Sequence, residues 1–188
     1  MSAAGLSKGT SGNISIYNAE EKLMAISPSG VGYFETVPED VVVMDLEGNV
    51  VEGDKKPSSE WGLHTVFYVN KPDAGAVVHT HSAYCTTFAC LNMPIKALHY
   101  VIGGAGTAEV PCAPYCTFGT PELAEAAIKA CGKESCLLQI TGFDLRPGIE
   151  KRVWAGSEYG ILCGNAVSGD VSRRTGRLSD EEWTWYGE

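Results

Sequence analysis

The sequence of 188 residues has few basic side chains and no long hydrophobic run. Its 14 lysines and arginines face 23 acidic residues, and the net charge of -9 argues against nucleic acid or an anionic membrane as the main partner. No apolar run is long enough to cross a bilayer. A small anion is held by local donors rather than by net charge, so an anionic small-molecule ligand remains open.

The sequence also lacks closely spaced cysteine pairs and the features of a secretory signal at its start. The seven cysteines are an odd number and include no C-x-x-C pair. The first residues, Met1 to Gly5, lack the basic and apolar regions of a secretory signal. We therefore expect a reduced, cytoplasmic protein, and the length fits one domain with a substantial core.

Alternation of apolar and polar residues, together with turn and cap signals, predicts short strands and three helices. The expected strands cover 13–17, 22–27, 41–45, 49–51, 74–80, 97–102 and 136–139, and the helices cover 60–69, 82–91 and 120–131. Ser58 or Ser59, Ser82 and Thr120 are the expected N-caps. Hairpins mixed with helices predict α/β layers around a sheet that is not purely parallel.

The most informative stretch, Ala76 to Ser82, is typical of a buried strand and ends in His79 and His81. Successive strand side chains point to opposite faces, so both imidazoles point to the same side, where one divalent metal ion can reach them. Two ligands do not complete a site, so the spacing leaves open that they are ordinary polar residues at a strand end. His64 and His99 are not expected to bind the metal.

A second stretch, Pro57 to Trp61, combines two serines with the start of a helix. Hydroxyls and free helical N–H groups can hold a phosphate there, and Glu60 can serve as metal ligand or base, although ordinary capping explains the same residues. Small-residue loops at 9–13 and 27–30 let backbone N–H groups approach an anion, although most such loops are simply turns. Neither loop matches a P-loop or a dinucleotide fingerprint.

Taken in order, six segments together resemble the class II aldolase/adducin-like family. They are G-T-S-G-N at 9–13, S-P-S-G at 27–30, P-S-S-E at 57–60, V-V-H-T-H at 77–81, L-H-Y at 98–100 and P-C-A-P-Y-C-T-F-G-T at 111–120. The resemblance implies one α/β domain over 1–188, well matched over 1–140. Its expected fold has three layers, α/β/α, around a central mixed, largely antiparallel sheet.

The resemblance also implies roles for residues at matching positions. Glu60, His79 and His81 match metal-binding residues, for Zn²⁺ or another divalent metal. Glu60 also matches the catalytic acid/base, and Tyr100 matches a catalytic tyrosine that protonates the leaving aldehyde oxygen. The positions that match phosphate-binding residues are Gly12, Asn13, Ser29, Gly30, Ser58 and Ser59.

The implied activity is cleavage of L-fuculose 1-phosphate, or a similar ketose 1-phosphate, to dihydroxyacetone phosphate and L-lactaldehyde through a zinc-stabilised enediolate. The implied assembly is a homotetramer with active sites between subunits. Two alternatives stay open: an L-ribulose-5-phosphate 4-epimerase or related sugar-phosphate lyase or dehydratase, and an inactive adducin-like binding protein.

The chain departs from the family pattern at Thr141, where a third zinc-binding histidine is expected. A threonine hydroxyl is a poor zinc ligand compared with imidazole. From about 141 to 188 the composition also shifts, with frequent glycines, several arginines and poor helical periodicity. Our hypothesis is a shift of reading frame near codon 140, because allowed codons for Gly142 to Val171, read one base later, spell an amphipathic helix.

Overall fold

The structure is a computed structural model. It describes residues 1–97, 99–100, 102, 107–131, 135–138 and 141–146, and for 135–138 and 141–146 it describes the backbone alone. The tail at 147–188 lies outside the described residues, so the frame-shift hypothesis stays a prediction.

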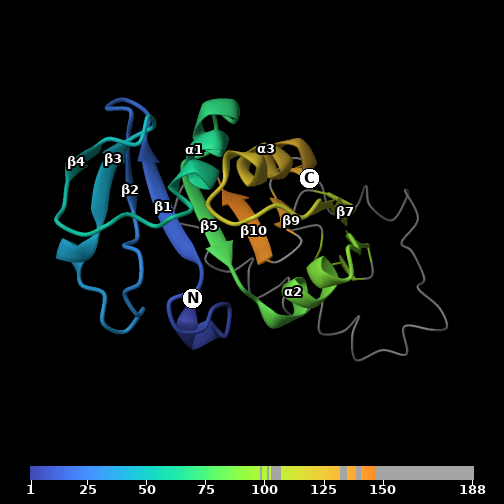
Figure 1. The fold of residues 1–188 in the computed structure, drawn as a ribbon. Coiled ribbons are helices and arrows are strands. Elements are labelled where there is room, and N and C mark those ends of the chain that lie inside the picture. The colour runs from blue at the N-terminus through green and yellow to red at the C-terminus, as the bar shows by residue number, and fades with distance from the viewer. Residues whose placement is uncertain (98, 101, 103–106, 132–134, 139–140, 147–188) are drawn as a thin grey trace.

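Eight strands form one sheet in the order β4-β3-β2-β1-β5-β10-β9-β8, which Figure 1 shows as a twisted layer. All neighbouring strands pair antiparallel except β8 and β9, which are parallel. The strand bounds are β1 Asn13–Asn18, β2 Leu23–Ile26, β3 Val42–Asp45, β4 Val50–Glu52, β5 Ala76–Thr80, β8 Cys112–Ala113, β9 Ser135–Leu138 and β10 Thr141–Arg146. The prediction of a mixed, largely antiparallel sheet is confirmed.

Among the residues that the structure describes, three α-helices and two named 3₁₀ helices accompany the sheet. Their bounds are η1 Ser2–Ala4, η2 Pro38–Asp40, α1 Trp61–Asn70, α2 Ala83–Cys90 and α3 Pro121–Ala130. The predicted cap of α3 is confirmed, because the Thr120 hydroxyl accepts a hydrogen bond from the Leu123 N–H at 3.3 Å. Pro121 follows at the first helical position, where its missing N–H costs nothing.

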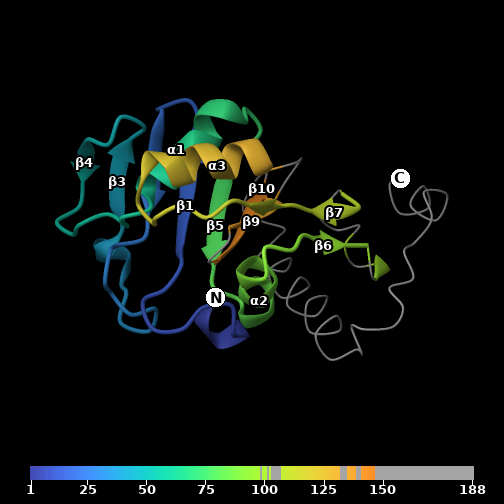
Figure 2. The same ribbon diagram turned by 45° about the vertical axis from the view of Figure 1, so that its right-hand side comes forward.

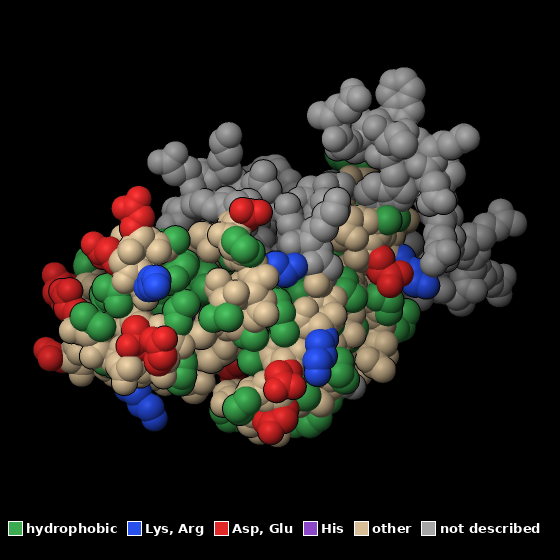
Figure 3. All heavy atoms as spheres, turned by 90° about the horizontal axis from the view of Figure 1, so that it is seen from above, with side chains coloured by type: hydrophobic (Ala, Val, Ile, Leu, Met, Phe, Trp, Pro, Cys, Tyr) green, Lys and Arg blue, Asp and Glu red, His purple; other side chains and the backbone are tan. Residues whose placement is uncertain are grey.

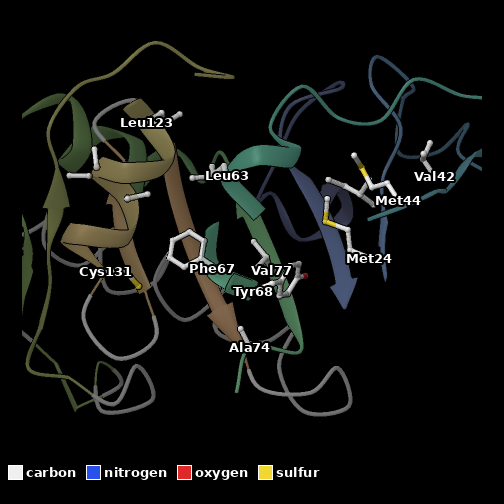
Figure 4. Packing of buried hydrophobic residues seen from close by; sticks show 14 residues of the cluster. Met24, Val42, Met44, Leu63, Phe67, Tyr68, Ala74, Val77, Leu123 and Cys131 are labelled. Carbon is white, nitrogen blue, oxygen red and sulfur yellow. The ribbon is translucent and has the colours of Figure 1, made fainter. Parts of the chain in front are cut away.

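Helices α1 and α3 pack together on one face of the sheet. The buried side chains of α1 recur at the helical period, and Figure 4 shows Leu63 and Phe67 between the helices and the strands. Phe67 is fully buried in a cluster that also contains Val77 of β5 and Ala113 of β8. Burying this apolar face against the sheet is the main source of stability for these short helices.

Helix α2 lies on the opposite face of the sheet. Ala113 of β8 points into the cluster under α1 and α3, so the preceding residue, Cys112, points to the other face. There its thiol contacts the carbonyl oxygen of Ala89, a buried residue of α2, at 4.0 Å. The expected three layers, α/β/α, are therefore present, and the turned view in Figure 2 shows α2 apart from the α1 and α3 pair.

Two sequence predictions about local structure are wrong. The strand expected over 97–102 comes earlier, as β6 Ile95–Lys96, which pairs with β7 Glu109–Val110 in a separate two-stranded sheet. The Ile102 N–H instead donates to the His99 carbonyl at 3.2 Å, which closes a turn. At the start of α1, the N-cap position falls on Glu60 rather than on either serine.

Acidic side chains are spread along the face seen in Figure 3 and are not gathered into one patch. This distribution is typical of a solvated surface rather than of a charged docking site. None of the described helices has the length and apolar character needed to span a membrane.

Candidate active site

The sheet topology brings four chain segments to one end of the domain. Because β1 is antiparallel to both β2 and β5, the start of β1 lies beside the ends of those two strands. The loop at 9–12 leads into β1 and the loop at 27–30 follows β2. His79 lies near the end of β5, and His81 comes directly after it. The segment before α1 joins them, because the Ser58 N–H donates to the Ser27 carbonyl at 3.1 Å.

The loop at 9–12 packs tightly against the end of β5 through Gly12. This residue has a φ of 78°, and a Cβ added there would lie 2.6 Å from the His79 carbonyl oxygen and 2.7 Å from the Ser7 hydroxyl. Only glycine fits such an approach without displacing backbone. The Tyr33 hydroxyl holds the same loop by donating to the Ser11 carbonyl at 2.8 Å.

The loop at 27–30 is joined to the segment before α1 by main-chain contacts. The Ser29 N–H donates to the Lys56 carbonyl at 2.8 Å, and Pro28 forms a bridge with Pro57. Behind this point, the Ser58 hydroxyl accepts from the Glu60 N–H at 3.3 Å. The loop at 27–30 and the segment before α1 therefore present small side chains and backbone groups to the same side of the domain end.

His79 and His81 lie side by side, as the alternation along β5 predicts. Their ring centroids are 5.1 Å apart. Burial holds the pKa of His79 well below its usual value, and the His81 and His64 rings, which would repel a second positive charge, lower it further. Burial also lowers the pKa of His81. Both imidazoles are therefore neutral near pH 7, the form that can donate a lone pair to a metal ion.

Glu60 carries a buried carboxyl that is only partly satisfied. Its side chain is 6% exposed, and among the described residues no hydrogen bond reaches its Oε2 atom. Burial raises the pKa of this carboxyl, while a hydrogen bond from the backbone of Gly119 opposes the shift. A buried carboxylate oxygen without a partner is costly unless a proton or a cation occupies it.

All these segments line one cavity of about 350 Å³. Every predicted phosphate-binding and metal-binding residue is part of its lining. The lining also includes Tyr115, Cys116 and Phe118, to which the sequence motifs assign no role. They belong to the segment at 111–120, one of the six segments that carry the family resemblance. Their apolar side chains stand there among small residues, and this pattern could have identified them.

Tyr100 and Thr141 are placed differently. Tyr100 is 58% exposed, does not line the cavity that the described residues form, and lies with its ring 4.3 Å from that of His99. Thr141 begins β10, one residue before the pair formed by Gly142 and Thr80. Because the two strands are antiparallel, position 141 comes next to His81.

The residues present fit a metal ion in donor type and, for the histidine pair, in spacing. Two imidazoles bound tetrahedrally to one zinc ion, each with a Zn–N distance of about 2.0–2.1 Å, have ring centroids about 5 Å apart, as His79 and His81 do. Glu60 adds an oxygen donor in the same cavity. Within the part of the chain that the structure describes, no group of three or more such side chains is close enough to share a metal ion, so Glu60 stays a predicted ligand.

Comparison with known proteins places this geometry in a family. The profile of the class II aldolase and adducin N-terminal domain matches residues 1–143. The chain belongs to the class II aldolase/adducin family. The predicted family is thus confirmed, and the cavity lies within the matched region.

Relatives within the class II aldolase/adducin family carry aldolase names. A 5-deoxy-D-ribulose 1-phosphate aldolase of Bacillus thuringiensis serovar kurstaki is 54% identical over 129 residues, which are 69% of this chain and 60% of that protein. An L-fuculose phosphate aldolase of Escherichia coli O6:H1 is 42% identical over 165 residues, 87% of this chain and 75% of that protein. A solved structure of an L-fuculose 1-phosphate aldolase superposes with a TM-score of 0.92 at 37% identity, covering 98% of this chain and 88% of that one.

Proposed function

We propose that this chain is a metal-dependent aldolase that cleaves a ketose 1-phosphate, with L-fuculose 1-phosphate as the first candidate. The products would be dihydroxyacetone phosphate and L-lactaldehyde. The observation that carries the proposal is the single cavity in which the small-residue loops meet Glu60, His79 and His81. Such a cavity can hold the phosphate of a substrate at one point and its reacting carbons at another.

The phosphate group is assigned to the loops. Gly12, Asn13, Ser29, Gly30, Ser58 and Ser59 all line the cavity and offer backbone N–H groups, hydroxyls or an amide. Gly12 packs on β5, and the loop at 27–30 is hydrogen-bonded to the segment before α1. These contacts hold the donors in place before a ligand binds. Pre-organised donors favour an anion because little conformational entropy is lost on binding.

His79, His81 and Glu60 would hold the metal ion, which we propose to be zinc. When bound, it supplies a Lewis acid that stabilises negative charge beside the substrate carbonyl. The neutral state of both imidazoles keeps their lone pairs available without loss of a proton.

Glu60 is proposed as the acid/base. Breaking the carbon–carbon bond leaves an electron pair on the carbon next to the carbonyl, and that carbon must then receive a proton. Burial raises the pKa of Glu60, which makes its carboxylate a stronger base than an exposed one and suits it to take up and return that proton. Its unpartnered Oε2 is the atom available for the transfer.

When the carbon–carbon bond breaks, the substrate hydroxyl that becomes the aldehyde oxygen loses its proton. Tyr100 of a neighbouring subunit in a homotetramer is proposed to relay this proton. Its exposure supports this assignment, since a 58% exposed tyrosine can reach a site on another copy. Size-exclusion chromatography with light scattering tests whether the protein forms a homotetramer. We propose the cytoplasm as its location. A monomer that retains full activity would contradict the shared site.

The aromatic part of the lining supports a substrate with an apolar end. Tyr115 and Phe118 give the cavity an apolar wall beside the polar loops. The relatives named above act on the phosphates of 5-deoxyribulose and fuculose, so a deoxy sugar that ends in a methyl group fits this wall. We therefore place 5-deoxyribulose 1-phosphate beside L-fuculose 1-phosphate in the substrate class.

The test measures release of dihydroxyacetone phosphate from each of these two ketose 1-phosphates, with added Zn²⁺ and after chelation. Cleavage that depends on the metal and falls at least about a hundredfold in Glu60→Gln is expected, since general acid–base catalysis contributes about that much or more. Glu52→Gln, an exposed carboxylate of β4 outside the cavity lining, is the control and should retain activity. Epimerisation of L-ribulose 5-phosphate without cleavage would favour the first alternative.

Absence of both bound zinc and any turnover would favour the inert binding protein instead. The reading frame bears on that outcome, because a frame shift near codon 140 would explain both Thr141 and the altered tail. Resequencing the gene tests it, and an intact frame shared with close homologues would refute the hypothesis.

A further inference from the structure

A chain of buried hydrogen bonds runs beneath the cavity and ends at one of its lining residues. The Tyr68 hydroxyl lies 2.6 Å from the Ser15 hydroxyl, which lies 2.6 Å from Nδ1 of His64. On the other side of the imidazole, Nε2 lies 2.5 Å from Oδ1 of Asn13. None of the four residues is more than 5% exposed, and His64 is fully buried. The metal and acid/base assignments leave His64 without a role.

The chemistry of the Asn13 amide determines which group donates and which accepts in each of these hydrogen bonds. An amide oxygen can only accept a hydrogen bond, so Nε2 of His64 carries the ring proton. In a neutral imidazole the other nitrogen, Nδ1, is then an acceptor, and Ser15 must donate to it. The Ser15 oxygen in turn accepts from the hydroxyl of Tyr68. Full burial keeps the imidazole neutral, because a charge there would be strongly desolvated.

The direction determines what Asn13 offers to the cavity. Because its Oδ1 is committed to His64, the planar amide turns its Nδ2 away from the helix. Within the described part of the chain, neither N–H of that group takes part in a hydrogen bond. Asn13 lines the cavity and stands first in β1, directly after Gly12. A flipped amide would instead present an oxygen, which repels an anion.

We propose that His64 is a positioning residue for the substrate phosphate: its Nε2–H fixes the amide of Asn13 so that the two N–H donors of that amide face the phosphate. The identity of the ligand rests on the function proposed above. The positioning itself rests on the buried hydrogen bonds from α1 to β1.

Two substitutions of His64 separate this role from simple packing. His64→Gln keeps a donor at about the place of Nε2, whereas His64→Asn keeps a partner for Ser15 but is too short to reach Asn13. The probe is inorganic phosphate, with affinity taken from calorimetric titration and thermal unfolding recorded for each variant. We expect His64→Asn to weaken phosphate binding about tenfold or more, as for one lost hydrogen bond to a charged group, and His64→Gln to stay within about threefold of the wild type.

A double-mutant cycle with Asn13→Ala completes the test. If His64 acts through Asn13, adding His64→Asn to Asn13→Ala changes phosphate affinity less than about twofold. A purely structural role would instead lower the affinity by the same factor in both backgrounds. Equal losses in the glutamine and asparagine variants, additive losses in the cycle, or no phosphate binding by the wild-type protein would each overturn the proposal.

The same variants keep this inference distinct from the proposed function. The expected cycle with inorganic phosphate, in a protein that cleaves no ketose phosphate, would support the positioning role and refute the aldolase. Cleavage with an unchanged KM in His64→Asn would support the aldolase and overturn the positioning role. If both hold, His64→Asn raises KM more than it lowers kcat, because the phosphate lies away from the reacting carbons.

Discussion

Acidification should destabilise this protein through His64 in a way that a single substitution removes. Burial lowers the pKa of His64 from 6.5 to about 3 in the folded state, so between these values the unfolded chain binds one proton more than the folded one. Stability is therefore unaffected by this group above about pH 6.5 and is lost as the pH falls toward 3. Each pH unit in that window costs about 1.4 kcal/mol, or about 3 kcal/mol at pH 4.

The assay is urea unfolding followed by tryptophan fluorescence at several pH values, for the wild type and His64→Gln, with a chelator present. Burial is the largest cause of the lowered pKa of His79 and acts in both proteins, whereas the His64 ring is the smallest of its causes, so most of the difference between the two proteins comes from His64. We expect the wild type to lose about 3 kcal/mol more than the variant between pH 7 and 4. A difference in free energy of unfolding that does not change with pH would refute the reasoning.

Three further substitutions test other parts of the structure. Gly12→Ala should cost about 1–3 kcal/mol of stability and weaken phosphate binding, because its Cβ would lie 2.6 Å from the His79 carbonyl oxygen. Gly9→Ala is the matched control, since Gly9 has a φ of 60° and open space around it. Equal effects of the two substitutions in urea unfolding would contradict the close approach at Gly12. Phe67→Ala should cost about 3–5 kcal/mol by the same assay, and a loss below about 1 kcal/mol would mean that this side chain is not in the core. Thr141→His should raise zinc affinity about tenfold or more, measured by competition with a chromogenic chelator. An unchanged affinity would mean that position 141 does not adjoin His81.

The main features of the candidate site could be predicted because they depend on local rules. Strand alternation puts His79 and His81 on one side whatever the rest of the chain does. Helix capping chemistry identifies the starts of α1 and α3 to within one or two residues. That the loops at 9–13 and 27–30 meet this pair depends on the pairing of β1 with both β2 and β5. Only the family resemblance supplied that long-range information.

Other features could not be derived locally. The strand predicted over 97–102 is wrong. Apolar side chains can be buried in a turn as well as in a strand, so the apolar residues there do not by themselves identify a strand. Strand β10 is not predicted from the sequence. Thr141, Phe143 and Leu145 do alternate with more polar or smaller residues, but the glycines that follow obscure this strand-like alternation. The direction of the hydrogen bonds around His64 depends on partners about 50 residues away in the sequence.

The position of β10 has a consequence for how this protein is made. This strand lies between β5 and β9 in the middle of the sheet, yet it is the last of the described strands to be synthesised. Until Arg146 has left the ribosome, a nascent chain presents open edges on both β5 and β9, each able to pair with another unfinished copy. Co-translational folding should therefore stall with the two halves of the sheet unjoined, and chaperones that shield strand edges should bind at that stage.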